Sequence, residues 1–269
     1  TWKSRGLGDV YKRQIYICSN FPDWQHVKTK IRWPYRRCFR SNCFHIRVSI
    51  SICLNYLFKD PILIETSKLY LIRHAEVEKL EGYIPENNAN AIINLDHLKI
   101  LATYIPHNCT CYVSPLKRAL QTATALSKFT NFKELLIDNK LKEQNFGEWG
   151  GKKISSVWNE IKMFKKKHNF SFIYPELSPP KGDSFLDQCK RIGSFMENLN
   201  LSNRKSIVII AHSGTIRAFL SYILHIDPNI ALSIEISHLS ITSLEVMTNG
   251  QLENSGGKYR LLNVNHTII

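Results

Sequence analysis

The sequence contains the segment Leu69-Tyr70-Leu71-Ile72-Arg73-His74-Ala75-Glu76, in which a short apolar run ends in an arginine and a histidine. An apolar run of this length bounded by charge is typical of a buried strand. In open α/β sheets, ligands bind beyond the carboxyl ends of the strands. A guanidinium beside an imidazole suits phosphate chemistry there, because the guanidinium pairs with phosphate oxygens and a neutral imidazole can attack phosphorus. The alternative is a strand that ends in two solvated polar residues.

A second apolar run, Ile207-Val208-Ile209-Ile210-Ala211, also ends in a histidine, His212. Ser213 and Gly214 follow it, and such small residues allow a close approach to the backbone at the start of a helix. The second run therefore predicts another strand that carries a candidate functional histidine at its carboxyl end. The alternative is that His212 has only a structural role, with its ring nitrogens hydrogen-bonded inside the protein.

Between the two runs, Ser114 and Pro115 predict a helix start, with serine as the N-cap and proline at the first helical position. The amino end of a helix favours anions through its free N–H groups and its dipole. Arg118 would lie one turn into this helix, although a solvated arginine is the alternative. Downstream, the Gly-rich segment 141–151 combines acidic and aromatic residues, and aromatic cover favours a protonated carboxyl. Its alternative is a surface loop with solvated acids.

The remaining periodicity predicts a loop over the site at 77–90 and further elements on both sides of it. These are helices at 91–104, 153–168 and 184–199, strands at 109–113 and 135–137, and strands or hairpin arms at 233–237, 240–247 and 259–264.

The net charge of +14 is unevenly distributed. Residues 1–66 hold 12 Lys and Arg against 4 Asp and Glu, whereas residues 67–269 hold 24 against 18. A basic surface is therefore not a property of the region with the motifs, and we expect no nucleic-acid partner. No apolar run approaches the ~20 residues of a membrane span, so we expect no membrane partner and a cytoplasmic location. The oligomeric state is not predicted.

We expect residues 1–66 to be a leader, disordered or artefactual, and residues 67–269 to be the catalytic domain. Residues 4–14 resemble translated sequencing adapter, and the leader shows neither a secretory layout nor a clear helical or strand period. A shift of one base in the codons of residues 32–42 permits Gly-Gly-Leu-Thr-Gly-Asp-Val-Phe-Gly-Ala, which resembles the C-terminal motif of cobalamin synthase. A real N-terminal extension with a disulfide or zinc role is the alternative, although its cysteine spacings match no zinc pattern.

Five ordered motifs over residues 67–269 resemble the histidine phosphatase superfamily, which is phosphoglycerate mutase-like. They are Arg73-His74-Ala75-Glu76, Ser114-Pro115-Leu116-x-Arg118-Ala119-x-x-Thr122-Ala123, Leu141-x-Glu143-x-x-Phe146-Gly147-x-Trp149-x-Gly151, Gly182-Asp183-Ser184 and His212-Ser213-Gly214-Thr215-Ile216-Arg217. The resemblance implies an α/β fold, a three-layer α/β/α sandwich with a mostly parallel central sheet.

The resemblance also implies a phosphoric monoester hydrolase. His74 would become phosphohistidine, and Glu143 would act as general acid and then as base. The implied phosphate-binding residues are Arg73, Arg118 and His212. It implies no cofactor and no metal, and the sequence offers no carboxylate cluster of the metal-site type.

Within the superfamily, the compact region favours a phosphatase over the glycolytic mutase. Ala75, the Phe-Gly-x-Trp that follows Glu143 and the segment 234–245 are most similar to α-ribazole phosphatases of cobalamin nucleotide-loop assembly. The expected partner is then a small phosphorylated metabolite, α-ribazole 5′-phosphate. The sequence departs from the usual pattern at 78–90, where only Gly82-Tyr83 resembles the family's loop, and this departure bears on the choice of substrate. Tyr83 and Ser213 are the candidate substrate contacts. A broad-specificity sugar phosphate or phosphoglycerate phosphatase or mutase is an alternative, and an inactive phosphoester-binding module is another.

Overall fold

The structure, a computed structural model, describes residues 65–78, 80–162, 168–201, 205–248 and 257–268. The predicted leader, residues 1–66, lies outside the described residues except for Glu65 and Thr66. The end of the helix predicted at 153–168 also lies largely outside them.

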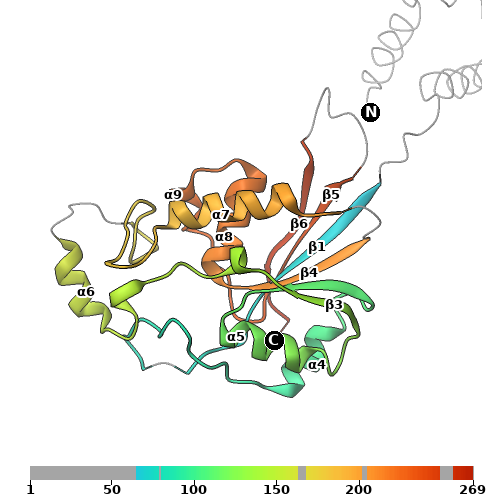
Figure 1. Cartoon of the computed structure of the whole chain (residues 1–269), viewed down its shortest axis with the longest axis horizontal. Coiled ribbons are helices and arrows are strands. Elements are labelled where there is room, and N and C mark those ends of the chain that lie inside the picture. Colours follow the sequence, from blue (N-terminus) through green and yellow to red (C-terminus); the bar gives the residue numbers. More distant parts are fainter. Residues whose placement is uncertain (1–64, 79, 163–167, 202–204, 249–256, 269) are drawn as a thin grey trace, which may run out of the picture. The chain divides into compact units, whose positions relative to one another are not determined.

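A sheet forms the centre of the described region, and its strands run in the order β3-β2-β4-β1-β5-β6 (Figure 1). The strands are β1 (Thr66–Arg73), β2 (Cys109–Val113), β3 (Phe132–Ile137), β4 (Ser206–Ala211), β5 (Ile241–Met247) and β6 (Tyr259–His266). β1 to β4 pair in parallel, whereas β5 is antiparallel to β1 and β6. The prediction of a mostly parallel sheet is confirmed.

Helices cover both faces of this sheet, with α7, α8 and α9 on one side and α4 and α5 on the other (Figure 1). The helices are α4 (Leu95–Ala102), α5 (Lys117–Leu126), α6 (Ile154–Ile161), α7 (Phe185–Asn198), α8 (Ser213–Leu224) and α9 (Pro228–Ala231), with short 3-10 turns η1 (Asn139–Leu141) and η2 (Gly147–Trp149). The predicted three-layer sandwich is therefore confirmed. Within the described residues, no helix has both the length and the apolar character needed to cross a membrane.

The apolar run of β1 is buried on both faces, as expected for a parallel strand inside a three-layer fold. Leu69 and Leu71 pack with residues of α7 and α8, whereas Ile72 packs with residues of α4 and α5. The register of β1 and β4 pairs Arg73 with Ala211. Because the strands are parallel neighbours, the residue that follows each of them arrives at the same edge of the sheet.

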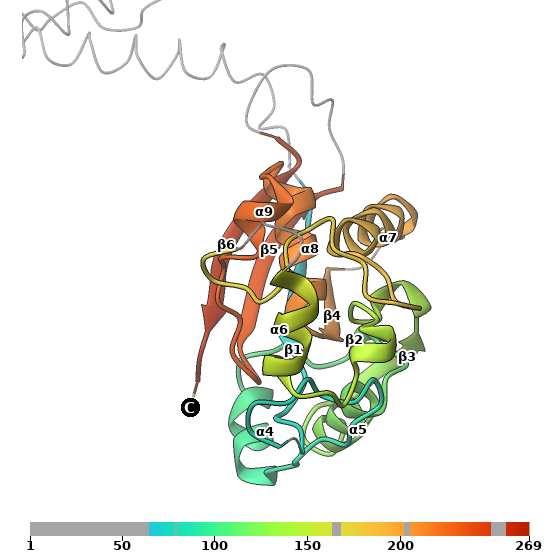
Figure 2. The ribbon, with the colours of Figure 1, turned by 90° about the vertical axis from the view of Figure 1, so that its left-hand side faces the viewer.

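A third, smaller core cluster lies around α6 and contains Ile84, Trp149 and Val157. α6 lies beyond the end of the sheet at which β1 ends (Figure 1, Figure 2). This cluster supports the loops that extend past the carboxyl ends of the strands.

Three sequence predictions of element bounds are wrong in instructive ways. The helix predicted at 91–104 begins only at Leu95, because the Asn94 side chain accepts from the backbone N–H groups of the first turn. Serine does not cap α5; its N-cap is Leu116. The Ser114 hydroxyl lies 2.7 Å from a ring nitrogen of His212. The hydroxyl therefore makes a long-range contact with His212 in addition to a contact with the N–H of Leu116.

The segment predicted as a strand at 233–237 is a loop after α9. The carbonyl of Ile234 accepts from Nε of Arg217 at 2.7 Å, and the carbonyl of Ile236 accepts from Nη1 of Arg73 at 2.5 Å. Carbonyl groups that a strand would pair with a neighbouring strand are thus taken by arginine side chains. The strands predicted at 240–247 and 259–264 do form, as β5 and β6.

Candidate active site

His74 follows β1 directly and is 4% exposed. Its Nδ1 lies 2.6 Å from the carbonyl oxygen of Ala75. A carbonyl oxygen can only accept a hydrogen bond, so we assign the ring proton to Nδ1. The lone pair of the neutral ring is then on Nε2, to which Nε of Arg118 donates at 3.2 Å. Nε2 is therefore the atom of this ring that can attack an electrophile.

His212 follows β4 and is the N-cap residue of α8. Its ring centroid is 4.9 Å from that of His74. The Ser114 hydroxyl accepts from the Leu116 N–H at 3.4 Å and lies 2.7 Å from Nε2 of His212. A hydroxyl has two lone pairs, so Ser114 can either accept a second hydrogen bond from Nε2 or donate its own proton to it. If Ser114 donates, the proton of a neutral His212 ring lies on Nδ1. This Nδ1 is buried and meets no described hydrogen-bond partner.

Both histidines have pKa values well below the usual 6.5. Desolvation by burial is the main cause for each. For His74 the neighbouring His212 and then Arg118 add to it, and for His212 the charges of Arg118 and Arg73 do so. Both rings are therefore neutral at pH 7, the state in which an imidazole is a nucleophile.

Three arginines supply positive charge around the two rings. Burial lowers the pKa of Arg73 to about 10, and the Glu143 carboxylate opposes this effect. Burial also lowers the pKa of Arg118 and Arg217, and Glu143 again acts in the opposite direction. All three guanidinium groups remain charged at pH 7. Each donates a hydrogen bond to a backbone carbonyl: Arg73 to Ile236, Arg118 to Asn87 and Arg217 to Ile234.

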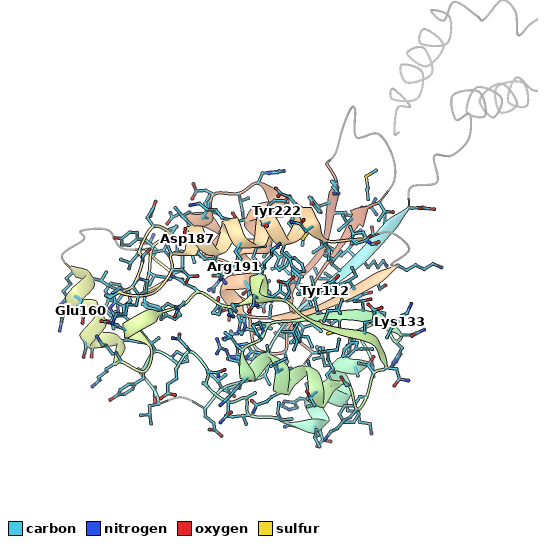
Figure 3. All side chains as sticks on the ribbon, viewed as in Figure 1. Tyr112, Lys133, Glu160, Asp187, Arg191 and Tyr222 are labelled. Atoms are coloured by element: carbon cyan, nitrogen blue, oxygen red, sulfur yellow. The ribbon has the colours of Figure 1, made fainter. Side chains whose placement is uncertain are left out.

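Glu143 follows η1 and is held at the amino end of α8. Nε2 of Gln188 donates to its Oε1 at 2.8 Å, and the backbone N–H of Gly214 donates to its Oε2 at 3.1 Å. A Cβ atom at position 214 would lie 2.3 Å from Oε1, so the carboxylate can lie here only because position 214 is glycine. The expected aromatic cover lies elsewhere: the indole N–H of Trp149 donates to Glu160 of α6 (labelled in Figure 3).

The segment that carries Glu143 is fastened to α7. Arg191, labelled in Figure 3, donates from Nε to the carbonyl of Lys140 at 3.2 Å and from Nη2 to that of Lys142 at 3.0 Å. Its Nη1 forms an ion pair with Asp183 at 2.7 Å. These contacts fix the backbone on the amino-terminal side of Glu143 and limit where its carboxylate can lie.

These groups share one cavity of about 620 Å³. Six of the seven residues predicted from the sequence line it, namely Arg73, His74, Tyr83, Arg118, Glu143 and Ser213. His212 is the exception: it is fully buried behind the lining. The structure thus brings the predicted set together, with His212 one layer deeper than the others.

The sequence reasoning did not identify several residues at this site. Arg217 lines the cavity, and its spacing of four residues from Ser213 on α8 was a usable signal, because such residues share a helix face. His238 also lines the cavity, 5.5 Å from His74 between ring centroids. It lies in a loop whose course depends on the arginines, and no local pattern marks it. Gln188 is an internal helix residue without any local signal.

The comparisons with known proteins agree with this geometry. The sequence model described as the histidine phosphatase superfamily (branch 1) matches residues 69–255. This chain belongs to the histidine phosphatase superfamily. The predicted superfamily is therefore confirmed, and with it the prediction of a phosphoric monoester hydrolase.

A Hydrogenobacter thermophilus protein named "Putative phosphoserine phosphatase 2" is 27% identical to this chain over 185 residues, which cover 66% of this chain and 89% of the relative. The mycobacterial glucosyl-3-phosphoglycerate phosphatase has the same fold, with a TM-score of 0.62 and 18% identity over 76% of this chain and 100% of its own. An Escherichia coli structure described as "a putative alpha-ribazole-5'-P phosphatase" has a TM-score of 0.61 at 16% identity, over 76% of this chain and 100% of its own.

Across the part of the chain that the structure describes, no three His, Cys, Asp or Glu side chains are grouped so as to hold a metal ion. The charged residues that line the cavity are instead Arg73, Arg118, Arg217, Lys142, Glu86 and Glu143. This arrangement can bind a phosphoryl group through its oxygens while Nε2 of His74 faces phosphorus.

Proposed function

We propose that the protein hydrolyses phosphomonoesters through a phosphohistidine formed on Nε2 of His74. The observation that carries this proposal is the tautomer of His74: the proton on Nδ1 is held by the Ala75 carbonyl, so the lone pair on Nε2 points to the arginines. Arg73 and Arg118 would bind the phosphoryl oxygens. The N–H on Nδ1 of His212 would stabilise the charge that spreads over them in the transition state.

The reaction would take place in two displacements at phosphorus. In the first, Nε2 of His74 forms a bond to phosphorus, the bond to the ester oxygen breaks, and Glu143, which must enter this step as the protonated carboxyl, gives its proton to the leaving oxygen. In the second, Glu143 takes a proton from water, the water oxygen bonds to phosphorus, and the bond to His74 breaks. Alcohol and inorganic phosphate are released, and the enzyme returns to its initial state.

As substrate we propose α-ribazole 5′-phosphate. The likeness of segment 234–245 to α-ribazole phosphatases supports this choice, and that segment holds His238 and the two carbonyls that position Arg217 and Arg73. The product would be α-ribazole and phosphate. An inactive binding module is the weaker hypothesis, because the His74, Arg73, Arg118, Glu143 and His212 set is intact.

A second candidate is a phosphatase or mutase for carboxylate-bearing phosphomonoesters such as phosphoserine or 3-phosphoglycerate. One observation favours it: Arg217 adds a third guanidinium to the cavity, beyond the two that would take the phosphoryl group. A carboxylate is the natural partner of such a group. The name of the Hydrogenobacter relative is consistent with this candidate.

Trapping the intermediate tests the mechanism. The full chain is mixed with a ³²P-labelled phosphomonoester, quenched, and analysed for protein-bound phosphate that is labile in acid and stable in base. We expect label on the wild type and on His97→Ala, a histidine of α4 outside the cavity lining, and none on His74→Ala. Turnover that survives in His74→Ala contradicts the mechanism.

Comparing kcat/KM for α-ribazole 5′-phosphate, phosphoserine and 3-phosphoglycerate decides the substrate. We expect α-ribazole 5′-phosphate to be preferred. A preference for 3-phosphoglycerate in which phosphate is moved and not released would replace the first candidate by the second.

A further inference from the structure

One wall of the cavity is formed by phenylalanine side chains. Phe146, Phe170 and Phe172 all line it, together with the phosphate-binding candidates already described. Phe146 lies just before η2, and the other two lie in the segment that follows α6. The cavity therefore has a cationic part around His74 and an uncharged aromatic part carried by different loops.

The aromatic wall is built onto the third core cluster. The rings of Phe146 and Phe172 lie 5.5 Å apart at an interplanar angle of 33°, and both pack against that cluster around α6. Two packed rings with a supporting core present a fixed apolar face. This face needs no rearrangement before it can contact a ligand.

Phe170 differs from this pair because its side chain is largely exposed, with its ring centroid 6.5 Å from that of His168. It is 76% exposed, more than any other large hydrophobic residue among those the structure describes. The backbone around it is nevertheless held: Nδ1 of His168 accepts from the Phe170 N–H at 3.1 Å, and Nε2 of His168 lies 2.8 Å from the Asn229 carbonyl at the start of α9. Ile173, on the other side, is buried. An exposed ring on an anchored backbone at the edge of a reaction cavity is poised to cover a ligand.

We propose that Phe146, Phe170 and Phe172 form a subsite for a flat aromatic group in the ester moiety of the substrate. The proposal rests on the proposed function, which holds the phosphoryl group at His74 and thus directs the ester group into the rest of the same cavity. The rings carry no charge and offer stacking and apolar contact. The subsite therefore selects the 5-phosphate of a sugar that bears an aromatic base over the same sugar phosphate without one.

The sharpest test compares α-ribazole 5′-phosphate with ribose 5-phosphate, because the leaving oxygen is a primary alkoxide in both and only the aromatic base differs. We expect the wild type to favour the first by at least about tenfold in kcat/KM, a typical gain for filling an apolar pocket. Phe170→Ser should remove most of that preference, because it should lower kcat/KM for α-ribazole 5′-phosphate far more than kcat/KM for ribose 5-phosphate. Leu80→Ser is the matched control, since Leu80 is 70% exposed but does not line the cavity.

Phe172→Leu separates ring stacking from apolar contact and should lower the preference less than Phe170→Ser. An unchanged preference in Phe170→Ser, in enzyme that hydrolyses both esters, overturns the subsite and leaves the phosphatase proposal standing. The subsite is also overturned if Leu80→Ser loses as much of the preference for α-ribazole 5′-phosphate as Phe170→Ser does. A solution mass that falls in Phe170→Ser would show that Phe170 contacts a second copy of the chain, and would overturn it as well.

Binding measurements keep the two proposals distinguishable. Calorimetric titration of the His74→Ala variant with each phosphate measures binding without turnover, and adding Phe170→Ser should weaken only the aromatic ligand. If the wild type forms no phosphohistidine yet shows this aromatic preference in binding, the proposed function fails and the subsite stands. Equal binding of the two ligands by His74→Ala overturns the subsite.

Discussion

At the scale of single residues, the site depends on where two protons lie. His74 has one ring nitrogen held by the Ala75 carbonyl, which can only accept, and His212 has one ring nitrogen against the Ser114 hydroxyl, which can donate to it. Backbone carbonyls and buried hydroxyls of this kind set the tautomer of a neutral imidazole. The lone pair of His74 is thereby assigned to Nε2. Donation from Ser114 to His212 would leave the His212 N–H on Nδ1, as the proposed chemistry requires.

Ser114→Ala tests this assignment. Without the hydroxyl, His212 can carry its proton on either nitrogen, and we expect kcat to fall by about 10- to 100-fold, less than the ~10²–10³ typical of losing a direct donor to the transition state. Steady-state kinetics should show the loss in kcat with KM little changed, and Ser114→Thr should restore activity.

Ser127→Ala is its matched control, because the Ser127 hydroxyl bonds only to the Ala123 carbonyl of its own helix. An equal decrease in kcat in both variants would contradict a role of Ser114 in positioning His212. A decrease in kcat that is explained by a lower free energy of unfolding of Ser114→Ala would contradict it as well.

At the scale of elements, α7 begins with a capping box that the motif Gly182-Asp183-Ser184 contains in part. The Ser184 hydroxyl accepts from the Asp187 N–H, and the Asp187 carboxylate accepts from the Ser184 N–H in return. α7 in turn carries Gln188 and Arg191, which hold Glu143 and its backbone. The start of this helix therefore determines where the proposed proton donor lies.

Ser184→Ala should lower the free energy of unfolding by about 1 kcal/mol, the usual cost of losing a serine cap. Urea denaturation at pH 7 measures it, with Ser156→Ala, an exposed serine of α6, as the control that should change little. Hydrogen bonds from Ser184 hold the pKa of Asp187 below its usual 3.8. The Asp187 carboxylate therefore contributes fully to the free energy of unfolding above pH 3.8. This contribution is lost as the pH falls through the lower pKa that Asp187 has in the folded chain. A destabilisation by Ser184→Ala that is as large at pH 2 as at pH 7 would contradict this account.

At the scale of the whole molecule, two buried neutral histidines affect the pH dependence of folding. Their pKa values in the folded chain lie well below 6.5, whereas in the unfolded chain they return to 6.5. Below pH 6.5 the unfolded state therefore binds more protons, and stability falls as the pH falls. Above pH 6.5 neither state protonates them, and this contribution is constant.

We expect the free energy of unfolding to decrease below pH 6.5 by up to about 1.4 kcal/mol per pH unit for each histidine that stays neutral in the folded chain. Urea denaturation at pH 5, 6 and 7.5 measures this slope. His212→Asn should make it shallower, whereas His97→Ala, on the partly exposed surface of α4, should leave it unchanged. A wild-type slope that is unaffected by His212→Asn would contradict neutral burial of that ring.

Much of the fold could be predicted because its elements carry local signals. Apolar runs predicted β1 and β4, and the sequence from Ser184 onward predicted α7 nearly to its bounds. The helix predicted at 91–104 was too long because Asn94 caps it locally and Val77 pairs with Ala91. The strand predicted at 233–237 was wrong because distant arginine side chains bind the carbonyls of that segment. Periodicity describes a segment's own faces and says nothing about such partners.

By itself, the sequence determined which residues stand at the ends of the parallel strands, since the end of an apolar run marks where a buried strand stops and which side chain comes next. His74, Arg73 and His212 were predictable for that reason. The tertiary structure alone decided the remainder: the depth of His212, the tautomers, the third arginine, His238 beside His74, and Gln188 against Glu143. These features arise from hydrogen bonds and burial between segments far apart in the chain, where low polarity makes each contact strong and no local pattern records it.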